Sequence, residues 1–349
     1  MKKKVYSFFL RLKYFIRDKE KKNGLLIIRD ILLLWILKRG FPFYYFGRVI
    51  YRKSAGKCTN YFSTREYYSI INSKTFNNPE YNTIMYNKLV LALYCEKHKI
   101  PAPRLLGYNL KRTFYFSGKN YRINTLADLN IYFNTIFKET GYQSLFVKPQ
   151  MGKGGKGAFM LRESKLEEQL QVVGNQLLSY FYVYQEVVEQ HREIQKIYPN
   201  SVNTLRINTY WDGDGQMHFM ETVMRFGAGG VEVDNNSSGG LYVSTHRATG
   251  RLGATAKSQL YFGGASYKVH PDTLIPFENF EIPFYREAHD LCSNLAKMLP
   301  NRLTGWDVAI GPKGPVLIEA NANQNILMGE YEHGGFKKHP VYQKIWAEK

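Results

Sequence analysis

The sequence predicts an α+β protein with two or three packed subdomains, and three observations carry this prediction. A strand, a glycine-rich loop and a second strand follow one another within residues 144–161. Hairpin patterns occupy residues 203–226 and 305–325. Stretches with helical periodicity lie before and between them, and 349 residues are enough to bury a large core.

The net charge of +19 is concentrated near the N-terminus. Residues 1–60 contain 16 Lys and Arg against three acids, a net charge of +13, which leaves +6 for the rest of the chain. The three cysteines form no CxxC pair, which argues against a disulfide framework or structural zinc and suits a reducing cytoplasm. We expect no membrane span, and Arg11 and Lys13 interrupt the apolar start too early for a signal peptide.

The N-terminal residues 1–80 predict a basic helical extension. Apolar residues recur at helical spacing through residues 1–17, with basic residues elsewhere on the wheel. Such a helix either lies on an anionic membrane surface, through residues 1–22, or packs on the core with a solvated basic edge. No nucleic-acid partner is expected, because no recognition module accompanies the charge. Residues 25–37 are apolar nearly all round and predict a buried helix.

The central part of the chain predicts helices that alternate with strands. A helix at Tyr86–Lys99 leads through a proline-bounded turn into a short strand. A second helix is predicted at Leu126–Lys138 and a third at Glu163–Tyr180. The apolar, β-branched run Tyr182–Val188 follows and predicts a strand.

The segment Ser144–Met160 is the most informative stretch of the sequence. An apolar strand delivers Lys148 to its end, where burial of a lysine is costly unless the ammonium meets an anion. Four glycines follow within six positions, and a second strand begins after them. This order predicts a loop that covers a polyphosphate, rather than the strand-to-helix turn of a P-loop. We interpret Lys153 and Lys156, within the loop, as solvated charges.

The pattern at residues 203–226 predicts a hairpin around the turn residues DGDG. In the simplest register Trp211 faces Gln216, so Arg206 lies opposite Glu221. Arg225 falls on the same face, while the other face is apolar. Arginines on an exposed strand are usually just solvated, so this hairpin alone is a weak functional signal.

The pattern at residues 305–325 predicts a second hairpin, and its apolar alternation sets the register. Val308 and Val316 reach a common core only if the residue numbers of two paired residues add up to an even number, such as 626. This register requires a loop of about five residues. Asp307 then lies opposite Glu319, with Asn321 on the same face. Two carboxylates this close cost stability unless a cation neutralises them, and hard oxygen ligands suit Mg²⁺. Taken alone, the hairpin would be read as a solvated polar face; together with the glycine loop it favours a nucleotide–metal site.

Taken together, these motifs resemble the ATP-grasp superfamily, and most of all its sugar-transfer-associated family. The resemblance runs from about Tyr86 to Asn325, with a weaker likeness back to about residue 30. The segments that carry it, in order, are NKLVLALYCEKHKIPAPRLLG, LFVKP with the glycine loop, YQEVVEQH, NTLRI, RFGAGGVEVDN, HPDT, GWDVAI and VLIEANAN. The implied fold has two α+β subdomains that grip ATP, a lid subdomain at 143–190 and a C-terminal subdomain at 191–349. A further subdomain, at 81–142, precedes them.

The resemblance implies a role for individual residues. Lys148 corresponds to the lysine that contacts the ATP phosphates, and Lys88 to an upstream lysine that assists it. The glycines that would close over the β- and γ-phosphates are Gly152, Gly154, Gly155 and Gly157. The hinge residues that would meet adenine and ribose are Gln185, Glu186, Val187, Val188 and Glu189.

The resemblance also assigns the metal and the reacting groups. Asp307, Glu319 and Asn321 match the magnesium ligands. Arg206 and Arg225 would stabilise a transferred phosphoryl group or an acyl phosphate. Four further residues are candidate substrate contacts, each with a structural alternative, a satisfied histidine or an Asx turn: His191, His270, Asp234 and Asn235.

The implied reaction is that of an ADP-forming carboxylate–amine ligase in cell-surface polysaccharide biosynthesis, with ATP and Mg²⁺. The acceptor would be a small molecule or a lipid-linked saccharide, at the inner face of the plasma membrane. Two alternatives stay open: an ATP-grasp kinase that phosphorylates a hydroxyl, and a non-catalytic nucleotide-binding protein. No residue pattern identifies either substrate.

Overall fold

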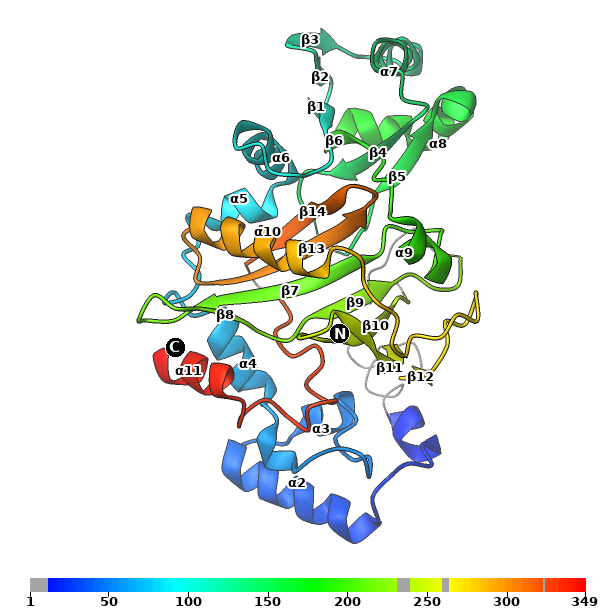
Figure 1. Ribbon diagram of the computed structural model, residues 1–349. Coiled ribbons are helices and arrows are strands. Elements are labelled where there is room, and N and C mark those ends of the chain that lie inside the picture. The colour runs from blue at the N-terminus through cyan, green and yellow to red at the C-terminus, as the bar shows by residue number, and fades with distance from the viewer. Residues whose placement is uncertain (1–11, 153, 231–238, 259–263, 323) are drawn as a thin grey trace.

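The computed structural model describes residues 12–152, 154–230, 239–258, 264–322 and 324–349. Two antiparallel sheets dominate it, one in the upper lobe and one across the middle of the molecule, with the N-terminal helices below them (Figure 1). The prediction of a mixed helix and strand protein is therefore confirmed.

The upper lobe is a six-stranded sheet with the strand order β3-β2-β1-β6-β4-β5. Helix α7 begins at a capping box of Thr125 and Asp128, ends at the left-handed Gly141, and shares a core with α8 and the sheet. One sheet thus spans the two segments predicted as 81–142 and 143–190. The elements of the lobe are β1 (Leu105–Leu110), β2 (Thr113–Phe116), β3 (Lys119–Arg122), α7 (Leu126–Thr140), β4 (Ser144–Pro149), β5 (Phe159–Arg162), η2 (Glu163–Lys165), α8 (Leu166–Ser179) and β6 (Phe181–Glu186).

The second sheet has the order β12-β11-β10-β9-β7-β13-β14, with β8 paired to β7. Helix α10 covers one face of it, and α5 and α6 join the same apolar core. The elements are α5 (Asn82–Tyr86), α6 (Lys88–Lys97), α9 (Arg192–Ile197), β7 (Thr204–Trp211), β8 (Met217–Phe219), β9 (Val223–Phe226), β10 (Leu241–His246), β11 (Arg251–Ser258), β12 (Ser266–Tyr267), α10 (Tyr285–Met298), β13 (Leu303–Gly311) and β14 (Gly314–Asn321).

The register predicted for the first hairpin is wrong. Trp211 pairs with Met217 rather than with Gln216, because the turn takes in all of residues 212–216. The pairing shifts again between β8 and β9, so Arg206 lies opposite Val223 and not opposite Glu221. On its other side Arg206 pairs with Asp307 of β13, a contact between strands far apart in the sequence.

The register predicted for the second hairpin is right at the carboxylates and wrong near the turn. Asp307 does pair with Glu319. A β-bulge at Ile318 then shifts the ladder, so Val308 faces Leu317 and the loop is shorter than expected, because Gly311 pairs with Gly314. The bulge turns Leu317 into the core, whereas Ile318 joins Glu319 in lining a cavity on the opposite face.

The N-terminal helices form a separate small core beneath the second sheet. Helix α2 (Gly24–Lys38) starts at Asn23, whose side chain accepts the Leu26 N–H, and packs through Ile27 and Leu34 on an aromatic cluster. The prediction that this helix is buried is wrong, since most of its apolar side chains face outward. No helix among the described residues is both long and apolar enough to cross a membrane. The other elements of this core are α3 (Phe43–Gly47) and η1 (Cys58–Asn60). Helix α4 (Thr64–Ile71) instead packs through Ile70 and Ile71 on a third core, which includes Tyr210 of β7.

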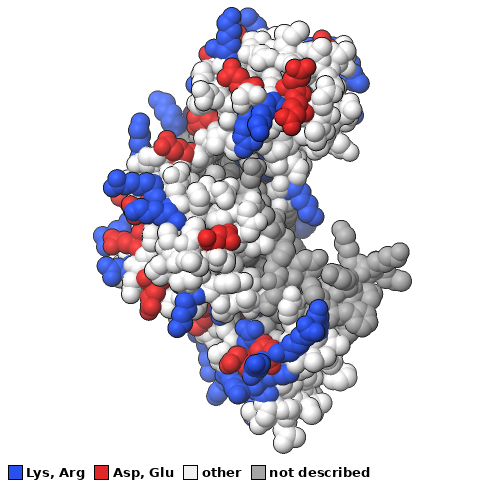
Figure 2. Space-filling model, turned by 90° about the vertical axis from the view of Figure 1, so that its right-hand side faces the viewer, with Lys and Arg blue, Asp and Glu red and all other residues white. Residues whose placement is uncertain are grey.

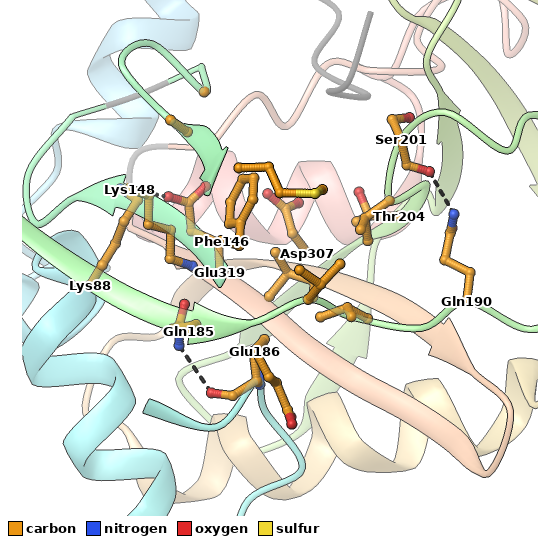
Figure 3. Close-up of a pocket in the computed structure, with 18 of the residues that line it drawn as sticks. Lys88, Phe146, Lys148, Gln185, Glu186, Gln190, Ser201, Thr204, Asp307 and Glu319 are labelled. Carbon is orange, nitrogen blue, oxygen red and sulfur yellow. Dashed lines mark hydrogen bonds and ion pairs between the residues drawn. The ribbon is translucent and has the colours of Figure 1, made fainter. Parts of the chain in front are cut away.

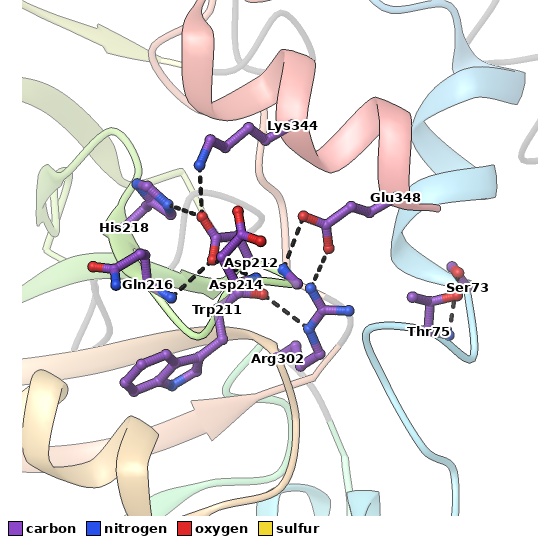
Figure 4. Close-up of polar contacts among 11 residues, drawn as sticks. Ser73, Thr75, Trp211, Asp212, Asp214, Gln216, His218, Arg302, Lys344 and Glu348 are labelled. Carbon is purple, nitrogen blue, oxygen red and sulfur yellow. Dashed lines mark hydrogen bonds and ion pairs between the residues drawn. The ribbon is translucent and has the colours of Figure 1, made fainter.

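The C-terminal helix α11 (Pro340–Glu348) is fastened to the β7–β8 turn by ion pairs (Figure 4). Asp212 accepts from Lys344 at 2.7 Å and contacts His218 Nε2 at 2.7 Å, while Arg302 pairs with Glu348. Hydrogen bonds from these partners hold the pKa of the Asp212 carboxyl well below its usual range.

The loop after β14 meets the N-terminal segment at two glycines. A Cβ on Gly56 would lie 2.5 Å from Gly334 O, so the two backbones touch with no side chain between them. Arg48 adds an ion pair to the buried Glu330 at 3.0 Å. Residues 12–60 are thus in direct contact with the loop that follows β14, the strand that carries Glu319 and Asn321.

Candidate active site

A cavity of about 770 Å³ is lined by residues of both sheets (Figure 3). The upper lobe contributes the ends of β4 and β6 and part of the glycine loop. The second sheet contributes β13, β14 and Arg225 of β9. Twelve of the residues predicted for the site line this cavity: Lys88, Lys148, Gly152, Gly155, Gln185, Glu186, Val187, Val188, Glu189, Arg225, Asp307 and Glu319.

Two lysines enter the cavity from different elements. Lys148 stands at the end of β4 and is 92% buried, and this burial lowers its pKa to about 8 even though Glu319 opposes the shift. Lys88, in the first turn of α6, pairs with Glu319 at 3.1 Å and donates to Gly152 O at 3.0 Å. Lys88 therefore connects β14, through Glu319, to the glycine loop, through Gly152.

The glycine loop connects β4 to β5, the two strands that the sequence predicted, and the structure pairs them antiparallel. Gly154 and Gly157 have φ of +72° and +76°, a conformation that L side chains rarely adopt. A side chain at Gly157 would also meet the Pro149 ring, at 3.2 Å. The glycines therefore let the loop turn tightly over the end of β4, next to Lys148.

The end of β6 leads from the upper sheet towards the second one, and the residues predicted to meet adenine and ribose lie there. The Glu186 carboxylate accepts from Arg104 N–H at 3.0 Å and from Tyr142 Oη at 2.6 Å, so its backbone rather than its side chain faces the cavity. Gln185 donates to Pro103 O at 3.0 Å. Its Oε1 is buried without a hydrogen-bond partner among the described residues, which is costly unless a donor from a ligand reaches it.

Asp307 is held between two arginines at the floor of the cavity. Its carboxylate accepts from Arg206 Nε at 2.5 Å and Nη2 at 2.9 Å, and lies 3.2 Å from Arg225 Nη2. Burial by itself would raise the pKa of Asp307, but the two guanidinium groups outweigh it and hold the pKa below its usual range. Arg225 also donates to Thr204 Oγ1. Both arginines are almost fully buried, so they are not the solvated strand residues that the hairpin alone suggested.

The donor set around Asp307 fits a magnesium ion. Glu319 pairs with Asp307 across the two strands, and Asn321 Nδ2 lies 3.5 Å from Asp307 Oδ2. No cluster of three or more His, Cys, Asp or Glu side chains occurs in the part of the chain that the structure describes. Two carboxylates with one amide nevertheless suit Mg²⁺, which typically completes its shell with water and substrate phosphates.

Two lysines and one carboxylate meet in the wall of this cavity, those of Lys88, Lys148 and Glu319. Lys148 is buried, and both its burial and the charge of Lys88 lower its pKa. A buried ammonium is expensive to hold away from water unless an anion meets it. The two lysines therefore favour an anionic ligand, and the facing carboxylates of Asp307 and Glu319 suit a metal bound to it.

One family model matches most of the chain. It is described as sugar-transfer associated ATP-grasp, and it covers residues 67–335. The chain belongs to this family. The resemblance and the ATP-grasp fold predicted from the sequence are thereby confirmed.

Solved ATP-grasp structures are similar to this chain at low identity. The ATP-grasp ligase PsnB in complex with a minimal precursor is 14% identical, with a TM-score of 0.43 over 78% of this chain and 64% of that chain. D-alanyl-alanine synthetase A from Vibrio cholerae is 12% identical, with a TM-score of 0.45 and coverages of 77% and 66%. N5-carboxyaminoimidazole synthase from Aspergillus clavatus is 12% identical, with a TM-score of 0.44 and coverages of 77% and 53%. The chain spans less than two-thirds of each of these proteins. No curated protein matches the sequence.

Some residues that the resemblance assigned do not line the ATP-grasp cavity. His270 is fully buried, with Nε2 bonded to Gly227 O at 2.9 Å and Nδ1 accepting from Asp272 N–H, so it cannot contact a substrate. His191 caps α9 by accepting the Glu193 N–H, which is the structural alternative. Asp234, Asn235 and Lys153 lie outside the described residues.

The sequence reasoning missed two parts of the ATP-grasp cavity. Phe146 and Met160, paired across β4 and β5, form an apolar wall together with Ile318. The alternation that points Lys148 inward could have identified Phe146, two residues earlier. A second wall, at residues 199–202, is braced by Gln190, which donates to Ser201 O at 2.5 Å, and no motif marks that segment.

Proposed function

We propose that this protein is an ATP-dependent carboxylate–amine ligase that forms ADP through an acyl phosphate. The observation that carries the proposal is the buried Lys148 in a cavity that also holds a facing pair of carboxylates. Phosphoryl transfer needs little covalent help from a protein and depends on positioning and on neutralisation of phosphate charge. This cavity has the parts for both.

The proposed nucleotide site extends from the hinge to Lys148. The apolar wall of Phe146, Met160 and Ile318 suits a purine, and the buried Gln185 Oε1 suits an exocyclic amine such as that of adenine. In this proposal the backbone of Glu186–Val188 meets the adenine edge and Glu189 meets the ribose. Lys148, assisted by Lys88, binds the phosphates beneath the loop glycines.

Asp307, Glu319 and Asn321 would hold Mg²⁺, which would supply charge neutralisation to the phosphates. In this proposal Lys88 leaves Glu319, its partner in the structure, and contacts the nucleotide phosphates instead. Arg206 and Arg225 keep Asp307 oriented and carry positive charge at the cavity, where they would stabilise the transferred phosphoryl group.

The proposed reaction has two steps. A substrate carboxylate oxygen attacks the γ-phosphorus of ATP, the bond to the bridging oxygen breaks, and ADP leaves. An amine then attacks the acyl carbon, phosphate leaves, and the amine nitrogen loses a proton. The family's association with sugar transfer supports a sugar or amino-acid acceptor of a cell-surface polysaccharide, free or lipid-linked, on the cytoplasmic side of the membrane. Residues 1–22 would add a basic contact with that membrane, and loss of vesicle binding on their deletion tests this contact.

Release of ADP tests the proposed reaction. The protein is incubated with ATP and Mg²⁺, with uronic acids and amino acids added singly and in pairs. A ligase releases ADP only when both a carboxylate and an amine are present, and hydroxylamine traps the acyl phosphate as a hydroxamate. A stable phosphorylated product would instead indicate a kinase.

The control for this assay separates binding from turnover. Asp307→Asn and Glu319→Gln should lose ADP formation while the protein stays folded by circular dichroism. Nucleotide binding that survives in both variants, with no turnover in the unaltered protein on any substrate pair, would leave only a nucleotide-binding role.

A further inference from the structure

Helix α2 exposes an apolar face that no other described element covers. Leu25 is 80% exposed and Ile36 is 76% exposed. At 100° per residue the exposed apolar positions occupy one side of the helix, with Arg29 as the single charge among them. We define the α2 face as Leu25, Ile28, Leu32, Leu33, Trp35 and Ile36. Helix α2 runs along the lower edge of the molecule, and no labelled element lies beyond its outer side (Figure 1).

The opposite side of α2 is firmly attached to the protein. Leu34 is fully buried, and Asp30 is 1% exposed. Asp30 accepts from Lys22 at 3.0 Å and from Arg29 at 2.9 Å. Burial raises the pKa of Asp30, but these hydrogen bonds outweigh it and keep the carboxyl ionised. The α2 face is therefore presented by an anchored helix, and its exposure does not come from a helix that has failed to pack.

Aromatic side chains extend the α2 face beyond the end of the helix. The ring of Trp35 lies 5.6 Å from that of Phe41, and Phe41 lies 4.7 Å from Phe43. All three rings are exposed. Aromatic residues beside an aliphatic helical face are typical of surfaces that enter the interface of a bilayer.

The charge around α2 selects among the surfaces that could cover it. Residues 12–60 contain twelve Lys and Arg against three acids, a net charge of +9. Lys and Arg gather beside uncharged surface at the lower end of the molecule (Figure 2). A second copy of the chain would bring these like charges together, whereas an anionic surface would neutralise them. Exposed basic residues in this segment are Lys13, Arg17, Lys19, Arg29, Arg39, Lys53 and Lys57.

We propose that α2 is an interfacial membrane helix that inserts its apolar face into an anionic lipid bilayer. At 15 residues it is about 22 Å long, too short to cross a hydrocarbon core of about 30 Å but suitable for lying within the interface. The basic residues around it contact the lipid headgroups. The inserted face belongs to α2 and not to residues 1–22, although Lys13, Arg17 and Lys19 of that segment are among the basic residues beside it. The proposal does not depend on the ligase reaction.

Vesicle binding by the full chain tests the proposal. The vesicles are phosphatidylcholine alone, or phosphatidylcholine mixed with phosphatidylglycerol. We expect binding to the mixed vesicles only, weakened when NaCl is raised from ~0.1 to ~0.5 M. The double variant Leu32→Asp with Ile36→Asp should bind about 10-fold more weakly or worse. A matched control places Ile131→Asp and Val172→Asp on the exposed sides of α7 and α8, and it should bind like the unaltered protein.

A second readout uses the protein without changes to the α2 face. In a Trp346→Phe background, Trp35 is the most exposed indole, since Trp306 is fully buried and Trp211 is half-buried. Its fluorescence should shift to the blue with anionic vesicles and be quenched by brominated lipids. Absence of that shift overturns the proposal. Vesicle binding that is lost on deletion of residues 1–11 but kept in the double aspartate variant also overturns it. A dimer that forms without lipid and dissociates in the double aspartate variant overturns it as well.

Discussion

Two ion clusters of the same protein differ in their surroundings. Lys88 and Lys148 face the carboxylate of Glu319 in the wall of the cavity (Figure 3). Beneath α11, Lys344 and Arg302 pair with Asp212 and Glu348 in a balanced cluster (Figure 4). The first cluster lines an open space and contains a buried ammonium, whereas the second lies between a helix and a turn that pack together. A buried cation beside a cavity thus indicates a ligand site, while a balanced cluster between packed segments indicates a structural role.

The largest effect expected from this comparison is at Lys148. Lys148→Met should weaken ATP binding about 100-fold or more, because the phosphates lose their buried cation. The melting temperature should stay the same or rise, since the variant no longer buries an ammonium. Isothermal titration and thermal denaturation measure the two effects. Lys138→Met, at an exposed lysine of the same lobe, is the control and should change neither.

The Lys148 variant also has a pH signature. The unfolded chain binds the Lys148 proton more tightly than the folded one, since its folded pKa is about 8 against an ordinary 10.5. The stability of the unaltered protein should therefore rise relative to the variant as the pH goes from about 8 to 10.5. Equal pH profiles for the two proteins would contradict the assignment of a buried ammonium.

The balanced cluster should respond in the opposite way. Asp212→Asn removes the carboxylate that holds Lys344 and His218, so we expect a melting temperature lower by a few degrees and unchanged ATP affinity. Asp214→Asn, at an exposed carboxylate of the same turn, is the matched control and should leave both values unchanged. Loss of ATP affinity in the Asp212 variant would break the distinction between the two clusters.

A smaller effect is expected at Glu66, which ties α4 to Lys38 and Lys337 away from the cavity. Burial raises the pKa of Glu66, but hydrogen bonds from the two lysines lower it to about 2. A carboxyl with a depressed folded pKa stabilises the protein above its unfolded pKa and loses that stabilisation as the pH falls. Between pH 6 and pH 4, urea unfolding should show about 1 kcal/mol more loss in the unaltered protein than in Glu66→Gln.

The smallest effect is expected at Lys156, which lines the cavity but is exposed to solvent. Exposed charges are screened, so Lys156→Ala should change ATP affinity less than about 3-fold at 0.15 M salt. A much larger loss would mean that the glycine loop contributes charge as well as shape to ATP binding.

Local patterns predicted what depends on neighbours in sequence. The strand, glycine loop and strand around Lys148 follow from residue order, and so does the pairing of Asp307 with Glu319 within one hairpin. The bulge at Ile318 escaped prediction because the choice between Leu317 and Ile318 for the core is made by α10 and the strands around it.

Contacts between residues far apart in the chain could not be predicted from local sequence patterns. The ion pair of Arg206 with Asp307 joins strands about a hundred residues apart. The predicted register of the first hairpin placed Arg206 opposite Glu221, because the pairing shifts once at β8 and again at β9. Helix α2 reads as buried because a pattern of apolar residues on all sides cannot say what the outer side will meet. His270 was ambiguous for a related reason, since its burial depends on aromatic rings of other segments, such as Tyr198.

Gly56 and Gly334 touch through their backbones, so the segment that carries α2 cannot slide against the loop after β14. If α2 rests on a bilayer as proposed, the second sheet and its carboxylates are held at a fixed height above the membrane. The six-stranded sheet and its glycine loop lie at the far end of the molecule from α2. A motion that admits a ligand to the cavity would then be a motion of that upper sheet, away from the membrane.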